Sequence, residues 1–262
     1  DLSAAKVLAN ELEKINQERK KIQEETFLEA ESLLRNDGDL KNKRVIVLAS
    51  KIFHPGVIGI AASKIVDKYN RPTVLIAMEE GLGKGSGRSI PKFNLFKAFT
   101  DCSSHLMQFG GHAYAAGLSI KEENIDAFCV AMNKVGSRYL QEKDLIPKLR
   151  IDTILKLSQI DLVLYKSVSL LEPFGAENPV PSFQSNKVQI KKVKYIGKEK
   201  NHIRFCATQG VRNIEAVAFN FAHIFDSIDI ANEVFDIAYE LHLNTWNGRE
   251  KLELRLLDLR GM

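Results

Sequence analysis

The sequence contains few cysteines, and their spacing excludes two cysteine-dependent classes of fold. Cys102, Cys129 and Cys206 are the only three among 262 residues, and no two of them form a C-x-x-C pair. Small disulfide frameworks and zinc knuckles both need closely spaced cysteine pairs. Neither class fits this chain, and we expect three buried, reduced thiols.

Long apolar runs are also absent. A membrane-spanning helix needs roughly 20 consecutive apolar residues, and no segment of the sequence approaches that length. The chain opens with Asp1 and a charged segment instead of the basic and apolar regions of a signal peptide. We therefore expect no membrane partner and a cytoplasmic location. Because an initiator methionine is missing, we also expect the chain to be a part of a longer protein.

The sequence lacks a cluster of Asp and His residues of the kind that binds paired metal ions. Hydrolysis of a phosphodiester by two metals needs such ligands around ions about 3.5–4 Å apart. Asp37 and Asp39 flank Gly38 after an expected helix end, where Asp and Gly are ordinary turn residues. Cys102 and His105 have a metal-like spacing but no second pair. We therefore assign no metal ligand and no cofactor to this chain.

The length and composition are those of a globular protein with two domains. Domains usually contain about 100–150 residues, so 262 residues allow one internal boundary. Hydrophobic residues make up 45% of the chain and charged residues 27%, which excludes a disordered protein. The net charge of +4 is compatible with a nucleic-acid partner but too weak to indicate one by itself.

The first half of the chain alternates helical and strand-like segments, which predicts the α/β class. Residues 3–35 contain helix formers without Pro or Gly, and their narrow apolar stripe indicates a connector helix, assigned to residues 1–38. Residues 39–145 predict an α/β domain with a central mixed sheet, because a β-α-β pattern implies parallel pairing. The expected strands are 44–50 and 73–78, and the expected helices are 57–69, 94–103 and 122–140.

The second half begins where Pro173, Pro179 and Pro181 lie close together. We place a linker with one helix, expected at 158–171, in residues 146–182. Strand patterns dominate residues 183–262, and about five short strands favour an all-β barrel of the OB type. An SH3-like barrel is the alternative, because strand number alone does not fix topology. The expected strands are 187–196, 203–208, 214–219, 234–243 and 251–259.

Alternating glycines run through the segment at residues 83–89, which reads Gly-Lys-Gly-Ser-Gly-Arg-Ser. Glycines allow backbone N–H groups to approach a ligand closely, and the hydroxyl and guanidinium groups are donors suited to phosphate oxygens. The segment matches neither the P-loop nor the dinucleotide-binding pattern. It predicts either an anion-binding cradle or a flexible hairpin with incidental polar residues. The residues assigned to phosphate binding are Gly85, Ser86, Gly87, Arg88 and Ser89.

Small residues surround His112 in a second glycine-rich segment, residues 110–117. A backbone or a ligand can come close to such a segment, and His112 would project from it as a hydrogen-bond donor or acceptor. His54 precedes an expected helix whose free N–H groups favour anions. The alternative for His112 is a structural role. The alternative for His54 is that Pro55 and Gly56 simply start the helix. The glycines assigned to substrate contact are Gly110, Gly111 and Gly117.

Positive charge is concentrated between residues 186 and 213. On a barrel face, cations with interleaved aromatic rings attract phosphates and stack bases, as in proteins that hold single strands without sequence preference. The alternative is that Phe205 points inward and the lysines solvate an edge strand. Trp246, in an expected hairpin, either stacks on a base or covers the end of the core. The residues assigned to single-strand binding are Lys191, Lys192, Lys194, Tyr195, Lys198, Lys200, Arg204, Phe205 and Trp246.

Four motifs, in order, resemble the DHH-associated domain of the RecJ exonucleases. They are FHPGVIGIAAS at 53–63, RP at 71–72, GSGRSI at 85–90 and FGGHAYAAGL at 109–118. The last motif alone would indicate only the wider DHH superfamily, which includes oligoribonucleases and nucleotide phosphatases. The segment LEPFGAENPVPSF at 171–183, with the barrel after it, is similar to RecJ itself.

The resemblance implies a role for each of these segments. Ser86 and Arg88 would grip the 5′ end of single-stranded DNA or its phosphate, His112 would support catalysis by contacting the nucleotide, and the barrel would guide the strand. The first helix would connect to an N-terminal DHH domain that this chain lacks and that binds manganese or magnesium. The chain would then be the substrate-binding part of a 5′-3′ single-stranded DNA exonuclease of DNA repair and recombination, inactive alone.

The sequence leaves two other functions possible. A stand-alone single-strand binding module would bind oligonucleotides by itself, with an affinity that depends on salt. A DHH-superfamily phosphodiesterase acting on oligonucleotides or nucleotides would hydrolyse them by itself with manganese, which requires metal ligands that the sequence does not show.

Overall fold

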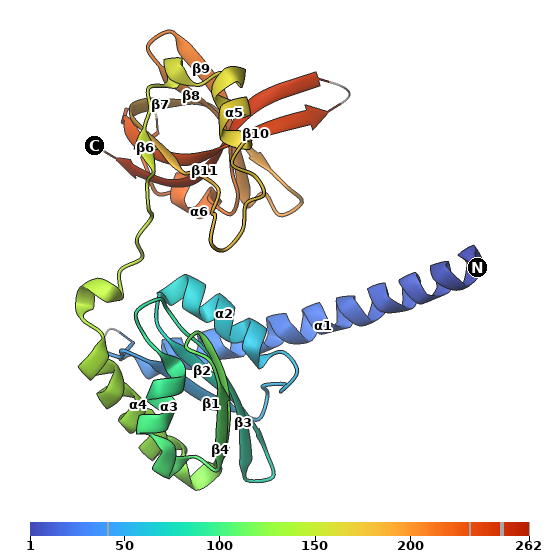
Figure 1. Cartoon of the computed structure of the whole chain (residues 1–262), viewed down its shortest axis with the longest axis vertical. Helices are drawn as coiled ribbons and strands as arrows, with labels where there is room; N and C mark the ends of the chain where they lie inside the picture. The colour runs from blue at the N-terminus through green and yellow to red at the C-terminus, as the bar shows by residue number, and fades with distance from the viewer. Residues whose placement is uncertain (41, 231, 247–248, 262) are drawn as a thin grey trace. The chain divides into compact units, whose positions relative to one another are not determined.

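The chain forms two compact units, Asp1–Pro147 and Lys148–Met262, in the computed structural model (Figure 1). The structure describes residues 1–40, 42–230, 232–246 and 249–261. No helix within these ranges is both long and apolar enough to cross a membrane. Each unit has a hydrophobic core of its own.

A five-stranded mixed sheet forms the centre of the first unit. Its strands are β1 (Ile46–Ser50), β2 (Thr73–Glu79), β3 (Leu82–Arg88), β4 (Gln108–Gly111) and β5 (Ala115–Lys121). Their order in the sheet is β1-β2-β3-β5-β4. β1 and β2 pair in parallel, and the remaining pairs are antiparallel. The predicted α/β domain with a central mixed sheet is confirmed.

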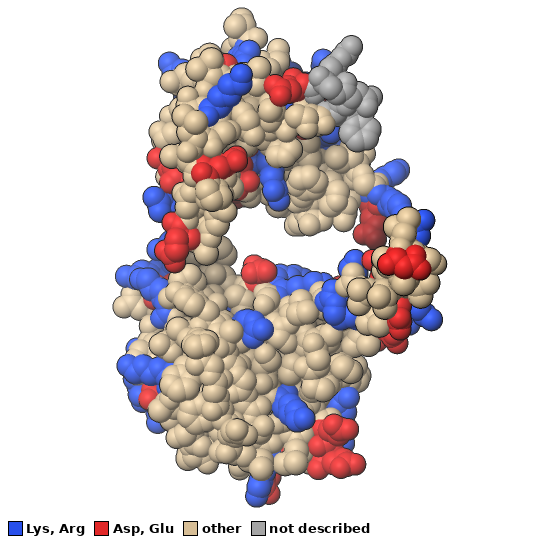
Figure 2. All heavy atoms as spheres, turned by 45° about the vertical axis from the view of Figure 1, so that its right-hand side comes forward, with Lys and Arg blue, Asp and Glu red and all other residues tan. Residues whose placement is uncertain are grey.

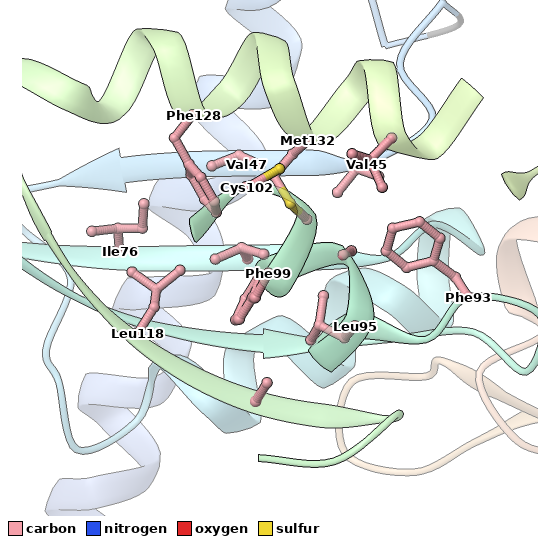
Figure 3. Close-up of a cluster of buried hydrophobic side chains, with 14 of the residues drawn as sticks. Val45, Val47, Ile76, Phe93, Leu95, Phe99, Cys102, Leu118, Phe128 and Met132 are labelled. Carbon is pink, nitrogen blue, oxygen red and sulfur yellow. The ribbon is translucent and has the colours of Figure 1, made fainter. Parts of the chain in front are cut away.

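Helices cover both faces of this sheet. They are α1 (Leu2–Asp37), α2 (Ile58–Tyr69), α3 (Leu95–Asp101) and α4 (Ile125–Tyr139), with 3₁₀ turns η1 (Ser103–His105), η2 (Glu122–Asn124) and η3 (Glu142–Asp144). α2 and the C-terminal part of α1 pack on one face, where Ile65 meets Leu75 of β2 in a buried cluster. α3 and α4 pack on the other face, and Figure 3 shows Phe99 and Phe128 of these helices within that core.

α1 extends beyond the sheet on which it packs (Figure 1). Ala30 and Leu34 in its C-terminal part are buried, whereas Leu8 and Leu12 near its start are more than half exposed. The helix ends at Gly38, which has a left-handed φ of 64° and closes the last turn without the strain that a side chain would add. The predicted long first helix is confirmed.

Glu31 joins α1 to α2 through two short hydrogen bonds. Its carboxylate, on a residue only 8% exposed, accepts from Lys68 Nζ at 2.6 Å and from Tyr69 Oη at 2.7 Å. Burial raises the pKa of this carboxyl, but the hydrogen bonds and the charge of Lys68 outweigh burial and hold the pKa below its ordinary value of 4.5. Burial and the Glu31 charge raise the pKa of Tyr69 to about 12.

The barrel of the second unit is built from β7 (Phe183–Ile196), β8 (His202–Gln209), β9 (Arg212–Ala218), β10 (Phe235–Trp246) and β11 (Arg249–Gly261). The order is β7-β8-β9-β11-β10, and β10 pairs back with β7, which closes the barrel. β9 and β11 are parallel and the other barrel pairs are antiparallel. The short helix α6 (Ala222–Phe225) lies between the third and fourth strands. This is the predicted OB-type barrel.

A linker was expected at residues 146–182, and from residue 148 onward this segment belongs to the second unit. They form β6 (Thr153–Ile154), η4 (Leu157–Gln159) and α5 (Leu162–Ser169), which is shorter than the helix expected at 158–171. Leu157 and Ile160 are fully buried in the barrel core. Arg212 on β9 donates to the Ile160 carbonyl at 2.6 Å, so this segment is tied to the barrel.

We predict that Glu31→Gln lowers the free energy of unfolding by about 1–3 kcal/mol, because Tyr69 and Lys68 lose a charged acceptor. A group with a lowered folded-state pKa stabilises the fold above its unfolded-state pKa and loses that effect as the pH falls through the folded-state pKa. The difference between variant and unchanged protein should therefore close on acidification below 4.5. Urea denaturation followed by far-ultraviolet circular dichroism measures it.

Glu25→Gln is the matched control on the same helix. The Glu25 side chain is 60% exposed and lies 3.9 Å from Lys21, and such surface pairs contribute only about 0.3–0.5 kcal/mol. Equal effects of the two changes would show that Glu31 does not fasten α1 to α2.

Candidate nucleic-acid interface

β3 places its glycines on one face of the sheet and its polar residues on the other. Gly83, Gly85 and Gly87 face the core under α3 and α4, where side chains already fill the space. A Cβ on Gly87 would lie 2.5 Å from Leu95 Cδ2, and one on Gly85 would lie 2.8 Å from Leu118 Cγ. These glycines are therefore required by close packing.

The predicted backbone cradle at Gly85 and Gly87 is wrong. β3 lies between β2 and β5 and pairs with both strands, so the sheet uses the backbone N–H groups that a phosphate would need. The alternative was a flexible hairpin. The segment is the second strand of the β2–β3 hairpin, and it is also paired with β5 on its other side. Ser86 and Arg88, both assigned to phosphate binding, lie within hydrogen-bond distance of each other on this strand.

Arg88 and Ser86 form the centre of a polar shelf on the opposite face of β3. Arg88 Nη1 donates to Ser86 Oγ at 3.1 Å and to the Gly87 carbonyl at 2.8 Å. Lys84, two residues earlier on the same face, is exposed. We use the name polar shelf for Lys84, Ser86 and Arg88. These two hydrogen bonds hold the Arg88 guanidinium in a fixed orientation, which suits bidentate recognition of phosphate oxygens.

The first turn of α2 lies beside this shelf because Gly59 has no side chain. A Cβ on Gly59 would lie 2.7 Å from Arg88 Nη2 and 3.1 Å from Ser86 Oγ. The N-terminus of a helix carries partial positive charge and attracts anions. The guanidinium and the helix terminus therefore favour an anion at the same place. Gly59 was not among the site residues predicted from the sequence, although Val57-Ile-Gly-Ile-Ala lies at the start of a predicted helix.

A strip without side chains continues the shelf across the sheet. Gly117 pairs with Ser86, and Gly110 pairs with Gly117, so all three share one face. Among the described residues, a Cβ on Gly110 would meet no atom within 4 Å, and one on Gly117 would lie 3.7 Å from the Gly85 carbonyl oxygen. A depression of about 410 Å³ is lined here by Lys84, Gln108, Gly110, Gly117 and Ser119, among others.

The turn from Gly111 to Ala115 presents His112 at the end of the same sheet. Gly111 has a φ of 139°, and a Cβ there would lie 2.5 Å from the Ala115 carbonyl oxygen. His112 donates its backbone N–H to that oxygen at 2.8 Å and is itself exposed. Ser89 N–H donates to the Tyr114 carbonyl at 3.0 Å, which ties the turn to the end of β3.

Two predicted residues act locally in the structure. Ser89 Oγ donates to the Phe93 carbonyl at 2.6 Å, so this hydroxyl has a partner within the loop, and its assignment to phosphate binding stays a prediction. His54 is exposed and accepts the Gly56 N–H at Nδ1, 3.1 Å away. This bond lies in the turn before α2, which begins at Ile58 and not at Pro55 or Gly56, and it leaves the rest of the imidazole open to solvent.

Exposed cations cover β7 and the loop after it. A bulge after Lys191 shifts the register, so that Lys191 pairs with Cys206 and Lys194 with Arg204. Lys192, inside the bulge, has a φ of 53°. We call the exposed lysines of this region the lysine edge: Lys191, Lys192, Lys194, Lys198 and Lys200.

Arg204 extends this positive charge onto β8, and Glu215 on β9 places a carboxylate among these cations. Lys251 Nζ lies 2.5 Å from Glu215 Oε1. The hydrogen bond from Lys251 holds the pKa of Glu215 below its ordinary value against the effect of burial, and the charges of Lys251, Arg204 and Lys192 add to it. Lys251 was not predicted as a site residue, because only the pairing of β11 with β9 brings it to Glu215. Figure 2 shows charges of both signs interspersed on the face that it presents, so local arrangement matters more than net charge.

The predicted stacking residues have different outcomes. Phe205 is 1% exposed and packs on Phe225 with ring centroids 5.6 Å apart, so its assignment to strand binding is wrong and the inward alternative holds. Tyr195 is 44% exposed; its hydroxyl donates to Asp226, and this bond raises the pKa of Tyr195. Trp246 is the last residue of β10, and its side chain lies outside the described part of the structure.

Two family models match the chain, one for each unit. The DHHA1 domain matches residues 42–137, and the RecJ OB domain matches residues 151–258. The single-stranded-DNA-specific exonuclease RecJ of Bacillus subtilis is 32% identical over all of this chain, and that of Haemophilus influenzae is 31% identical over 97% of it. The chain belongs to the RecJ family. It spans 34% and 45% of these two RecJ proteins.

Solved RecJ structures have the same fold. RecJ from Thermus thermophilus in complex with Mn²⁺ is 27% identical, with a TM-score of 0.77 over 99% of this chain and 37% of its own. The Mg²⁺ complex of that protein matches with a TM-score of 0.74. Among the described residues of our chain, no group of three or more His, Cys, Asp or Glu residues is placed to hold a metal ion. These residues therefore do not fit a RecJ metal centre.

The glycines of this interface should respond differently to a methyl group. We predict that Gly111→Ala lowers the free energy of unfolding by about 1–3 kcal/mol, because a Cβ would clash with backbone at a φ that L residues rarely adopt. Gly110→Ala and Gly117→Ala should change it by less than about 1 kcal/mol, since both have room. Thermal unfolding of the three variants tests this. Equal losses would contradict the packing described for β4 and β5.

Proposed function

We propose that this chain is the substrate-binding part of a RecJ-type exonuclease that digests single-stranded DNA from its 5′ end in repair and recombination. The observation that carries the proposal is the polar shelf: Arg88 and Ser86, fixed by a hydrogen bond of 3.1 Å, lie beside the first turn of α2. Such an arrangement binds a terminal phosphate through charge-assisted hydrogen bonds.

The strip at Gly110 and Gly117 would take the nucleotide that follows the bound phosphate. Without side chains there, a sugar or base comes close to the sheet beside Ser86. His112, exposed on the adjoining turn, would contact the same nucleotide and support catalysis by orienting it. The lysine edge would hold phosphates further along the strand, through attraction that does not depend on sequence.

Bond cleavage needs metal ions that residues outside this chain would bind. RecJ of Thermus thermophilus was solved with Mn²⁺ and with Mg²⁺, and bound divalent ions lower the pKa of water and stabilise a leaving oxygen. In this division of labour our chain supplies binding and orientation of the strand. The chain alone is then expected to bind single-stranded DNA without hydrolysing it.

We predict that Arg88→Ala weakens binding of a 5′-phosphorylated oligonucleotide by about tenfold, because charge-assisted hydrogen bonds contribute about 1.5–3 kcal/mol. Binding of the same oligonucleotide with a 5′-hydroxyl should change little. Fluorescence anisotropy with a label at the 3′ end measures both. Arg138→Ala is the control, since Arg138 lies on α4 over the opposite face of the sheet. An unchanged preference for the 5′-phosphate in Arg88→Ala would refute the assignment.

We predict that the double change Lys192→Ala and Lys194→Ala reduces the salt dependence of binding. Each lost phosphate contact on a single strand lowers the slope of log K against log salt concentration by about 0.7, so the pair should lower it by about 1.4. Titrations between 50 and 200 mM salt are the measurement, on the scale of ionic strengths over which such binding varies. The double change Lys156→Ala and Lys166→Ala, at exposed positions outside the barrel strands, should leave the slope unaltered; equal slopes in all three proteins would contradict a role of the lysine edge.

A further inference from the structure

Phe219 exposes an aromatic ring on the outer face of the barrel. Ala216 and Ala218 just before it are fully buried, whereas Phe219 is 47% exposed. The alternation of β9 therefore continues past its last residue and turns the ring outward. Val217 pairs with Arg204 of β8 and with Arg255 of β11, so the ring lies two residues beyond a position flanked by two cations.

Two neighbouring side chains hold the ring in place. His202 packs its ring edge-on against Phe219, with centroids 5.3 Å apart and planes at 75°. The Arg255 guanidinium lies 5.4 Å from the centroid of the Phe219 ring. His202 is itself fixed, because its Nδ1 accepts the Asn220 N–H at 3.0 Å. A ring oriented before binding loses little side-chain entropy when a ligand stacks on it.

Hydrogen bonds connect the turn that follows Phe219 to the loop of the lysine edge. Asn220, with a left-handed φ of 62°, accepts at Oδ1 a hydrogen bond of 3.3 Å from Asn201 Nδ2. Asn201 ends the loop that carries Lys198 and Lys200, and its carbonyl accepts the Ala222 N–H at 3.3 Å. An exposed ring and a lysine-bearing loop are thus held together by hydrogen bonds within one end of the barrel.

We propose that Phe219, supported by His202 and Arg255, is a stacking platform for one nucleobase of the bound strand. The inference rests on the proposed function and adds a specific contact to it. A ligand for this surface needs a flat aromatic ring and negative charges on either side of it, which is the chemistry of a nucleotide within a single strand. Stacking on the ring accepts any base, since every base has a π-face, while Arg204 and Arg255 would meet the flanking phosphates.

The test compares an oligo(dT) strand with an abasic strand of the same length and charge, both labelled at the 3′ end. Phe219→Ala should bind oligo(dT) about tenfold more weakly than the unchanged chain and bind the abasic strand equally well. Phe219→Leu, which keeps apolar bulk without a π-face, should lose as much. Phe219→Trp should retain the affinity. Val211→Ala, at a fully exposed apolar position in the β8–β9 turn, is the control that should change nothing.

The outcomes separate this platform from the proposed function. If Phe219→Ala binds both strands as the unchanged chain does, or weakens both equally, the stacking platform is refuted while single-strand binding stands. If the unchanged chain binds neither strand, the proposed function is refuted and the platform with it. Melting curves of the variants by circular dichroism show whether a loss of binding reflects loss of the fold.

Discussion

Close packing beneath β3 is the constraint on which the candidate site depends. The core side of the strand has no room for a Cβ at Gly83, Gly85 or Gly87, since each would lie within 2.8 Å of a buried side chain. Because side chains alternate along a strand, the same glycines fix which residues face the other way. Ser86 and Arg88 are aligned on the outer face as a consequence, and a change on the core side would shift both.

Under the proposed function, the two units would bring positive charge to a DNA strand in different ways. Arg88 is held by two hydrogen bonds and by the space that Gly59 leaves, so its guanidinium has one orientation, as recognition of a single terminal phosphate requires. The lysines of the barrel are exposed on flexible stems, and such point charges follow a moving backbone without specifying its position. An enzyme that holds a strand and advances along it would need both a specific site for the terminal phosphate and a surface that binds the backbone without fixing its position.

Sequence patterns were sufficient where one period dominated. The long first helix, the β-α-β unit and the five barrel strands all follow from periods of 3.6 or 2. β3 was not predicted as a strand, because glycine is poor in strands and only the neighbouring Leu95 and Leu118 explain it. Alternation predicted that Arg204 and Phe205 lie on opposite faces of β8, but it did not show which face is buried. The buried face is the one that points into the barrel closed by β10 and β7, and it carries Phe205. The packing of residues 148–182 on the barrel was not predicted, because it depends on Leu157 and Ile160, whose partners in the core are distant in sequence.

The electrostatics of the shelf favour a ligand over a purely structural role. A guanidinium beside the N-terminus of a helix brings two positive centres together, which is unfavourable on its own. Ser86 Oγ and the Gly87 carbonyl, which accept hydrogen bonds from Arg88 at 3.1 and 2.8 Å, offset part of this cost. A residue whose only task was stability would be better placed at the other end of the helix. An anion at this position would stabilise both centres at once, and for that reason we propose that the shelf binds phosphate.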